Sequence, residues 1–301
     1  MIEFRNVSKT YTSILGRSVK AVEDFSLSVA AGEVLGVAGP NGAGKSTLIA
    51  MLLGYIKPTA GAITVGGKPP RAYVEDHGVG YLSELINIPP RWRADGALER
   101  YAVLSGVPEA RLAASVDASV EKLGLEEHRK KSIKALSKGN LQRVGMAQAL
   151  AEPADVFILD EPTHGLDPVW TQRFRDIVTG LRRPERAVIL ASHNLDELER
   201  LCDRVAIIDH GMLQRVVKTR VSGDDSAATT YRVCVASGAE KVSAAFPGAK
   251  AQGNGEFELA GVDLAVLNRT LATLMLDGVV VTSIAPAHSA LEREFREAVA
   301  R

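Results

Sequence analysis

A glycine-rich loop that ends in lysine is the feature of this sequence that most clearly indicates chemistry. Residues 33–38 predict a buried strand before it, and residues 48–54 predict a helix that ends at a glycine. Glycines let successive backbone N–H groups face one anion, and the following helix points its positive dipole at the same place. The loop consists of Gly39, Pro40, Asn41, Gly42, Ala43, Gly44, Lys45, Ser46 and Thr47.

Two side chains of this loop extend the prediction from an anion to a triphosphate. Lys45 supplies a positive charge for the outer phosphates, and the Ser46 hydroxyl is placed to hold Mg²⁺. The alternative is a glycine-rich turn that binds nothing, which accounts for neither the Lys-Ser-Thr ending nor the flanking strand and helix. The loop therefore predicts a nucleoside triphosphate site.

Two adjacent carboxylates follow another predicted strand. Residues 156–159 are a continuous apolar run, typical of a central parallel strand, and Asp160 and Glu161 come at its carboxyl end. Buried carboxylates are costly without partners, and open α/β sheets bind ligands at that edge. Asp160 can approach the metal ion, and Glu161 can hold the water that attacks the γ-phosphate. The alternative is two solvated acids in a loop.

Three other features could contact the same ligand, and each has an ordinary structural alternative. His193 follows the strand predicted at residues 187–191 and is a candidate γ-phosphate sensor, although a lone histidine is usually a surface or core residue. Ser137 and Gly139 precede a predicted helix and form a second potential anion site, with a simple helix cap as the alternative. Tyr11, near the end of the first strand, could stack on a base or only pack.

Length and composition limit the class of protein. A chain of 301 residues suits two domains, and 36 basic against 36 acidic residues suggest no general attraction to nucleic acid or anionic lipid. Cys202 and Cys234 have no metal or redox spacing, which favours two small buried hydrophobes in a reducing compartment. The N-terminus lacks the apolar core of a signal peptide, and apolar runs stay short of the roughly 18–20 residues that span a bilayer. A membrane role would therefore require a partner.

The pattern predicts an α/β fold with a mostly parallel central sheet and a second, smaller domain. Antiparallel strands are expected at the N-terminus, and a helical subdomain at about 91–153 within a domain of residues 1–215. A linker at 216–226 then leads to an α+β unit at 227–301 without a catalytic constellation. An alternating strand and a leucine stripe in that unit leave apolar faces that something must cover. This favours a dimer clamp, with a regulatory domain or a docking surface as open alternatives.

Taken together, the motifs of residues 1 to about 215 resemble the nucleotide-binding subunit of an ATP-binding cassette (ABC) transporter, a P-loop NTPase fold. The order and spacing of several motifs carry this resemblance, so it is more specific than a phosphate loop alone. The matches are Gly39–Thr47 for the Walker A loop, Val156–Glu161 for the Walker B strand, Leu136–Asn140 for the signature sequence, Gly165–Pro168 for the D-loop, His193 for the switch histidine, Tyr11 for the adenine-stacking aromatic and Glu84 for the Q-loop position.

The resemblance implies a homodimer in which two copies bind head to tail around two ATP molecules and Mg²⁺. Each signature segment, through Ser137 and Gly139, would cap the γ-phosphate held on the other copy's Walker A loop. Glu161 would be the general base, His193 would hold γ-phosphate and water in line, and Asp167 would communicate across the dimer. The metal ligands would be Ser46, Asp160 and, by its reach, Glu84.

Two departures from the family pattern refine the expectation. Lys138 and Asn140 replace Gly and Gln in the signature, and Glu84 replaces the Q-loop glutamine. Together with the C-terminal unit they resemble the exporter branch whose ATPase is a separate chain. That branch implies separate integral-membrane permease subunits and a cytoplasmic position on the inner face of the membrane. The permease would select the cargo, so the sequence predicts no substrate.

Two other classes share the phosphate loop. A soluble mechanical ATPase acting on ribosomes or DNA would carry two cassettes with a basic linker or long heptad coiled coils, and neither pattern occurs in the sequence. A guanine-nucleotide switch would need an Asn-Lys-x-Asp-like base-reading motif, which is also missing, and would not need a signature sequence.

Overall fold

The computed structural model describes residues 1–13, 16–151, 154–219, 230–286 and 290–299. The chain divides into two compact units, Met1–Arg220 with Ala298–Arg301, and Val221–Glu297. The two units are described separately below.

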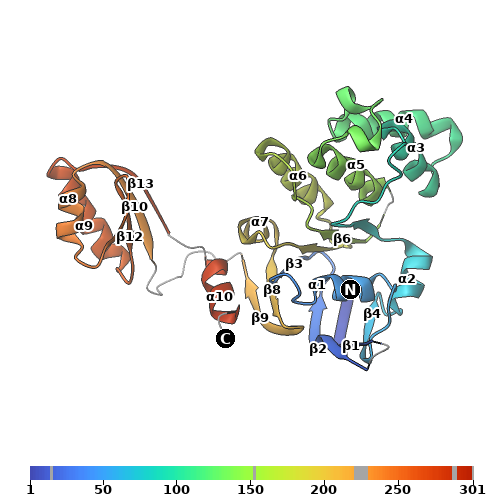
Figure 1. The fold of residues 1–301 in the computed structure, drawn as a ribbon, viewed down its shortest axis with the longest axis horizontal. Coiled ribbons are helices and arrows are strands. Elements are labelled where there is room, and N and C mark those ends of the chain that lie inside the picture. Colours follow the sequence, from blue (N-terminus) through green and yellow to red (C-terminus); the bar gives the residue numbers. More distant parts are fainter. Residues whose placement is uncertain (14–15, 152–153, 220–229, 287–289, 300–301) are drawn as a thin grey trace. The chain divides into compact units, whose positions relative to one another are not determined.

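A six-stranded sheet of order β5-β6-β7-β3-β8-β9 forms the centre of the first unit (Figure 1). The first five strands in that order are parallel, and β9 pairs antiparallel with β8. Every residue of β3, β6 and β7 is buried, as expected for parallel strands covered on both faces. The bounds are β3 Val34–Ala38, β5 Gly80–Leu82, β6 Val156–Asp160, β7 Ala187–Ala191, β8 Arg204–Asp209 and β9 Met212–Lys218.

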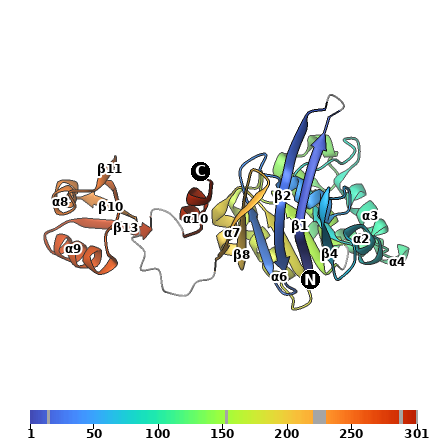
Figure 2. The ribbon, with the colours of Figure 1, turned by 90° about the horizontal axis from the view of Figure 1, so that it is seen from below.

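A three-stranded antiparallel sheet of order β2-β1-β4 packs into the same core (Figure 2). Its strands are β1 Ile2–Thr12, β2 Ser18–Val29 and β4 Ala60–Val65. Helix α1, Lys45–Leu52, follows the glycine-rich loop and shares a buried cluster with this sheet. The antiparallel strands expected at the N-terminus are present: β1 and β2 pair from Ile2 with Val29 to Thr12 with Ser18.

Helices cluster in the middle of the chain, where the sequence pattern of residues 91–153 predicts them (Figure 1). The last helix of this group ends at 151, and residues 152–153 lie outside the described part of the chain. The helices of the first unit are α2 Pro70–His77, α3 Ala94–Leu104, α4 Glu109–Lys122, α5 Lys138–Ala151, α6 Pro168–Leu181 and α7 Leu195–Leu201, with 3₁₀ turns at Glu126–His128 and Ile133–Ala135.

Strand β9 alters the predicted boundary between the two domains. The sequence places the linker at 216–226, but β9 continues through Lys218, which pairs with Arg204 of β8. The hairpin with β8 keeps these residues in the sheet, an effect that composition alone does not predict. Residues 220–229, and with them most of the predicted linker, lie outside the described residues.

The second unit has the order βαββαβ, with an antiparallel sheet β11-β12-β10-β13. This order is that of a ferredoxin-like fold. Its core includes Leu267, Leu271 and Leu274 of the predicted stripe, whereas Leu264 is 53% exposed. The bounds are β10 Tyr231–Ser237, α8 Ala239–Ala245, β11 Lys250–Gly253, β12 Glu256–Leu259, α9 Leu264–Leu276, β13 Val280–Pro286 and α10 Ala290–Val299.

Both cysteines are free thiols. Cys202 is fully buried, which confirms its predicted place in the core, and burial raises the pKa of its thiol. Cys234 in β10 is only partly buried. Over the described residues, the search for membrane-spanning segments finds no helix that combines sufficient length with sufficient apolar character.

Candidate nucleotide site

Close packing explains two glycines of the loop between β3 and α1, Gly39 and Gly44. Gly44 is the N-cap of α1 with φ of 105°, and a Cβ added there would lie 2.5 Å from the carbonyl oxygen of Ala21. A Cβ on Gly39 would lie 2.4 Å from the carbonyl oxygen of Ile208. Neither position can hold a side chain without moving backbone, so glycine is needed to bring the loop across the end of the sheet.

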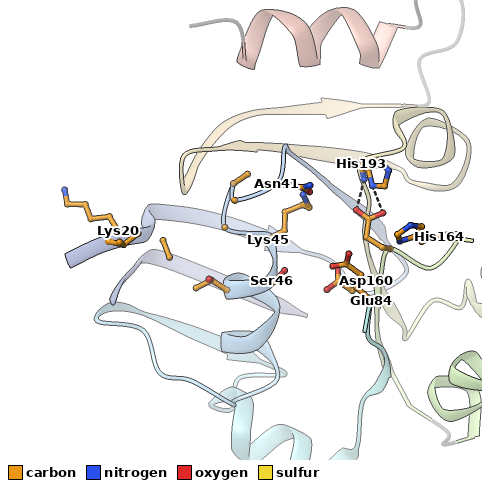
Figure 3. Close-up of a pocket in the computed structure, with 15 residues that line it drawn as sticks. Lys20, Asn41, Lys45, Ser46, Glu84, Asp160, His164 and His193 are labelled. Carbon is orange, nitrogen blue, oxygen red and sulfur yellow. Dashed lines mark hydrogen bonds and ion pairs between the residues drawn. The ribbon is translucent and has the colours of Figure 1, made fainter. Parts of the chain in front are cut away.

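Lys45 is held inside the loop by the loop's own backbone. Its Nζ donates to the carbonyl oxygens of Gly39 at 2.6 Å and Pro40 at 3.1 Å, and the residue is 8% exposed. An ammonium so deeply placed keeps its charge close to the cavity that the loop borders. Figure 3 shows Lys45 and Ser46 on the same side of that cavity, next to Asn41.

The cavity has a volume of about 600 Å³, within the range of small-molecule sites. Five separate segments of the chain supply its polar groups: strand β2, the loop, and the exits of β5, β6 and β7. The lining residues are Val19, Lys20, Ala21, Asn41, Gly42, Ala43, Gly44, Lys45, Ser46, Thr47, Glu84, Asp160, Glu161, His164 and His193.

Three carboxylates converge at one side of this cavity. Asp160 and Glu161 are 6% and 7% exposed, and Figure 3 shows Glu84 beside Asp160. Burial, followed by the negative charges of Glu84 and Glu161, raises the pKa of Asp160 to about 6, while Lys45 acts in the opposite direction. The protein therefore concentrates negative charge that one nearby ammonium does not balance.

This donor set fits Mg²⁺. The excess negative charge at Asp160 favours a cation, and the oxygens of Ser46, Asp160 and Glu84 are the hard ligands that Mg²⁺ prefers. Within the described part of the chain, His, Cys, Asp and Glu side chains form no group of three or more that could hold a metal. A magnesium ion here would need phosphate oxygens as further ligands, which is common for Mg²⁺.

Glu161 is held against the exit of β7 by side-chain and backbone contacts. Its carboxylate accepts from the backbone N–H of His193 at 3.0 Å and from the Ser192 hydroxyl at 3.3 Å, and His193 Nδ1 lies 2.8 Å from Oε2 (Figure 3). The Gln142 amide donates to the carbonyl oxygens of Glu161 and Pro162. Glu161 also has φ of 46°, a conformation rare for a residue with a side chain. These contacts fix the carboxylate at the cavity wall and place an imidazole directly beside it.

The signature segment borders a different cavity, of about 290 Å³. Ser137 is exposed, and its hydroxyl accepts from the N–H of Asn140, so it caps the start of α5 as expected. A Cβ on Gly139 would lie 2.7 Å from the carbonyl oxygen of Gly165, so glycine allows this helix to pack against the loop that precedes α6. The lining residues are Ser137, Lys138, Gly139, Asn140, Arg143, Gly165, Leu166, Asp167 and Trp170.

The predicted residues therefore fall into two groups within one chain. Asn41–Thr47, Glu84, Asp160, Glu161 and His193 border the first cavity, and Gly39 and Pro40 contact Lys45. Ser137, Gly139 and Asp167 border the second. Asp167 is also the N-cap of α6, where its carboxylate accepts from the N–H of Trp170 at 2.9 Å.

Tyr11 borders neither cavity. It is 44% exposed and pairs across the hairpin with Val19, which lines the first cavity. Directly opposite residues of an antiparallel pair point to the same face, so the Tyr11 ring lies on the side of the hairpin that Val19 presents to the site. The Lys9 ammonium lies 5.4 Å from the ring centroid. Stacking on a base therefore stays a prediction.

Sequence reasoning missed two functional candidates, His164 and Lys20, which both line the first cavity. His164 lies three residues after Glu161, and its backbone N–H donates to the Glu161 carbonyl oxygen at 3.1 Å. The sequence signal that could have revealed His164 is its position in the turn between Asp160 and the D-loop. Lys20 lies on β2, far from any motif, so only the pairing of the strands reveals its position.

Comparisons with known proteins agree with this arrangement. A family model described as ABC transporter matches residues 22–164. The ABC transporter ATP-binding protein NatA of Bacillus subtilis is 34% identical over 197 residues, which is 64% of this chain and 80% of that protein. This chain belongs to the ABC transporter ATP-binding proteins.

Other relatives of this ABC transporter ATP-binding protein differ in how they are described. An uncharacterised ABC transporter ATP-binding protein of Nostoc is 38% identical over 204 residues, covering 66% of this chain and 60% of the relative. The methionine import ATP-binding protein MetN of Caulobacter vibrioides is 38% identical over 218 residues, covering 70% and 65%. The matched part of the chain thus spans less than two thirds of the length of both relatives.

Solved structures show the same fold. The dimeric structure of MJ0796, a bacterial ABC transporter cassette, aligns with a TM-score of 0.67 at 23% identity, covering 73% of this chain and all of that chain. The structure of an ATP-binding subunit of an ABC transporter aligns with a TM-score of 0.64 at 26% identity, covering 72% of this chain and 90% of that one. The fold prediction for the first domain is therefore confirmed.

Proposed function

We propose that this ABC ATPase binds and hydrolyses ATP at the first cavity and thereby powers transport through separate membrane subunits. The observation that carries the proposal is the contact between Glu161 and His193 at the exits of β6 and β7, opposite Lys45 and Ser46. A carboxylate and an imidazole on one side, with phosphate-binding groups on the other, suit the attack of water on a terminal phosphate.

Each group of the site has a distinct task in this proposal. The loop N–H groups and Lys45 bind the phosphates, and Glu161 accepts a proton as the water oxygen bonds to the γ-phosphorus and the bond to the β–γ bridging oxygen breaks. His193 holds the carboxylate and the phosphate in line. Ser46, Asp160 and Glu84 would hold Mg²⁺, which when bound neutralises charge that develops on the phosphates.

The separation of the two cavities supports a head-to-tail homodimer. Ser137 and Gly139 border a cavity that shares no lining residue with the first, which suits a nucleotide brought by another chain. Two copies would close around two ATP molecules, each supplying the signature segment for its neighbour, and Asp167 would communicate across the interface. Hydrolysis would then release the dimer and transmit a stroke to the permease.

Coupling to integral-membrane permease subunits would place the protein on the cytoplasmic face of the membrane. The relatives support a transport role, and MetN is described as an import protein. Export is proposed from the Lys138, Asn140 and Glu84 variants and from the second unit. A mechanical ATPase that is not coupled to transport is the alternative. Co-purification with a multi-span membrane protein would distinguish the two.

The second unit is proposed as a dimer clamp. Four apolar side chains of α9 are more than half exposed, two in its first turn and two in its last, and we take these ends as the surface that a second copy would cover. They are Leu264, Val266, Met275 and Leu276. A regulatory role or a contact with the permease are the alternatives.

The experiment that tests the catalytic proposal is steady-state hydrolysis by Glu161→Gln. We expect turnover to fall by roughly 100-fold or more while ATP affinity stays within about 3-fold, because the amide cannot accept the proton but leaves the phosphate contacts intact. Glu75→Gln, on the exposed surface of α2, is the matched control and should keep full turnover. Undiminished hydrolysis by Glu161→Gln would remove Glu161 from the base role.

A further inference from the structure

One side-chain contact joins the two cavities of the chain. The Lys138 ammonium, at the first residue of α5, lies 2.8 Å from Nε2 of His164. Lys138 lines the signature cavity and His164 lines the nucleotide cavity. The contact therefore links the group of residues proposed to serve the partner's nucleotide with the group that hydrolyses the chain's own.

The chemistry of the two groups sets their roles in this contact. A lysine ammonium has three donors and no acceptor, so it donates and Nε2 of His164 accepts. Gly165 leaves room for the contact: a Cβ there would lie 2.9 Å from Cγ of Lys138. Glycine at 165 thus leaves the room through which the lysine side chain passes.

From His164 the path continues to the catalytic carboxylate. The His164 ring meets the His193 ring edge to face, with centroids 6.3 Å apart and planes at 86°. His193 in turn contacts Glu161 through its backbone N–H and through Nδ1. The backbone N–H of His164 also donates to the Glu161 carbonyl oxygen. A displacement of His164 would therefore act on Glu161 through two contacts: the ring contact with His193 and the backbone hydrogen bond to the Glu161 carbonyl oxygen.

We propose that Lys138 and His164 are positioning residues that couple the two ATP sites of the dimer. The inference rests on the proposed head-to-tail dimer. When a γ-phosphate on the partner chain reaches the start of α5, the Lys138 ammonium has an anionic acceptor that binds it more strongly than a neutral imidazole. Lys138 then releases His164. The His164 ring changes position and thereby shifts His193 and Glu161 in the hydrolytic site of its own chain. Occupancy of one site thereby changes turnover at the other.

The test is the ATP dependence of hydrolysis by the full chain. Wild type should show a Hill coefficient of about 1.5 or more, and Lys138→Met or His164→Phe should each lower it, since either change removes the link. The double variant should be no worse than either single variant, because both act through one contact. Lys138→Arg keeps a cation and should restore cooperativity. Lys134→Met, an exposed lysine of the nearby 3₁₀ turn, is the matched control and should behave as wild type.

Three outcomes would overturn the proposal: no cooperativity in wild type, an unchanged Hill coefficient in Lys138→Met, or single-variant effects that add in the double variant. Failure of this inference is distinguishable from failure of the proposed function. An ATP-dependent dimer of Glu161→Gln that coexists with any of those outcomes would leave the dimer standing and remove only the coupling. Absence of that dimer would remove both.

Discussion

The two cavities of the first unit differ in how completely one chain builds them. In the nucleotide cavity Lys45, Asp160 and Glu161 are all less than 10% exposed, and Lys45 and Glu161 are held by contacts within the chain. In the signature cavity Ser137 and Lys138 are exposed, and a simple helix cap accounts for the one hydrogen bond described for the serine hydroxyl. The first is preorganised for a ligand, whereas the second offers groups to something brought from outside.

The two cavities differ in the free energy that charge burial costs. Burying an ammonium and two carboxylates is costly, Lys45 offsets only part of the cost at Asp160, and opposite charges that enter the site are therefore stabilised. An exposed helix start buries no charge, so it can remain without a ligand at no cost to the stability of the chain. The comparison therefore predicts large effects of substitution in the first cavity on nucleotide affinity.

Removing the buried ammonium should have the largest effect. For Lys45→Ala we expect nucleotide affinity to fall by about 100-fold, because the charge acts at close range in a site shielded from water. Lys20→Ala is the matched control: it lines the same cavity, but its side chain is 65% exposed and paired with Glu23. Its loss should change affinity by less than about 3-fold. Equal effects of the two variants, measured by titration calorimetry, would contradict the comparison.

The carboxylate cluster should make the nucleotide-free protein less stable as pH rises. In the folded state the pKa of Asp160 is raised from 3.8 to about 6, so the native state binds more protons between these values and stability falls with increasing pH there. Above pH 6 the full cost, about 3 kcal/mol, is present. Asp160→Asn should therefore raise the melting temperature in EDTA by about 5 °C at pH 7.5 and little at pH 4.5.

The control for this measurement is Asp176→Asn, an exposed carboxyl of α6 that lies outside the nucleotide cavity. It should leave the melting temperature nearly unchanged at both pH values. A gain for Asp160→Asn of the same size at pH 4.5 and 7.5 would show that charge burial is not its cause.

The smallest effect is expected in the second unit, whose described residues include no buried charge at a ligand site. Met275→Asp combined with Leu276→Asp should weaken the ATP-dependent dimer about 3-fold without altering nucleotide affinity, because two apolar side chains that are 53% and 88% exposed would become charged. Asn268→Asp, on the exposed surface of the same helix, is the control. A dimer of unchanged stability by analytical ultracentrifugation would dispose of the clamp.

Local patterns were sufficient to predict the nucleotide cavity. Strand, loop and helix are consecutive for residues 33–54, and the carboxyl ends of β6 and β7 must meet at one sheet edge, which brings Asp160, Glu161 and His193 together. The contact between Lys138 and His164 joins residues 26 apart and depends on how α5 packs on the loop before α6, so no local pattern reveals it.

The missed elements have a similar explanation. Residues 250–253 of β11, Lys-Ala-Gln-Gly, carry no alternation and few strand formers, and they form a strand because β12 pairs with them. Helix α2 is mostly polar and has only Tyr73 buried, so its apolar period is weak. Leu264 fits the stripe of α9 in sequence but lies at its first turn, beyond the edge of the core.

The head-to-tail dimer is tested most directly by the mass of Glu161→Gln, measured by light scattering with and without ATP and Mg²⁺. We expect ATP to shift the mass from that of one chain, 32.1 kDa, to twice that value. We expect no shift when Ser137→Arg is added, although each such chain still binds ATP. The arginine would block the signature cavity while leaving the nucleotide cavity intact. A double variant that dimerises as fully as Glu161→Gln, or a Glu161→Gln chain that binds ATP and stays at 32.1 kDa, would contradict it.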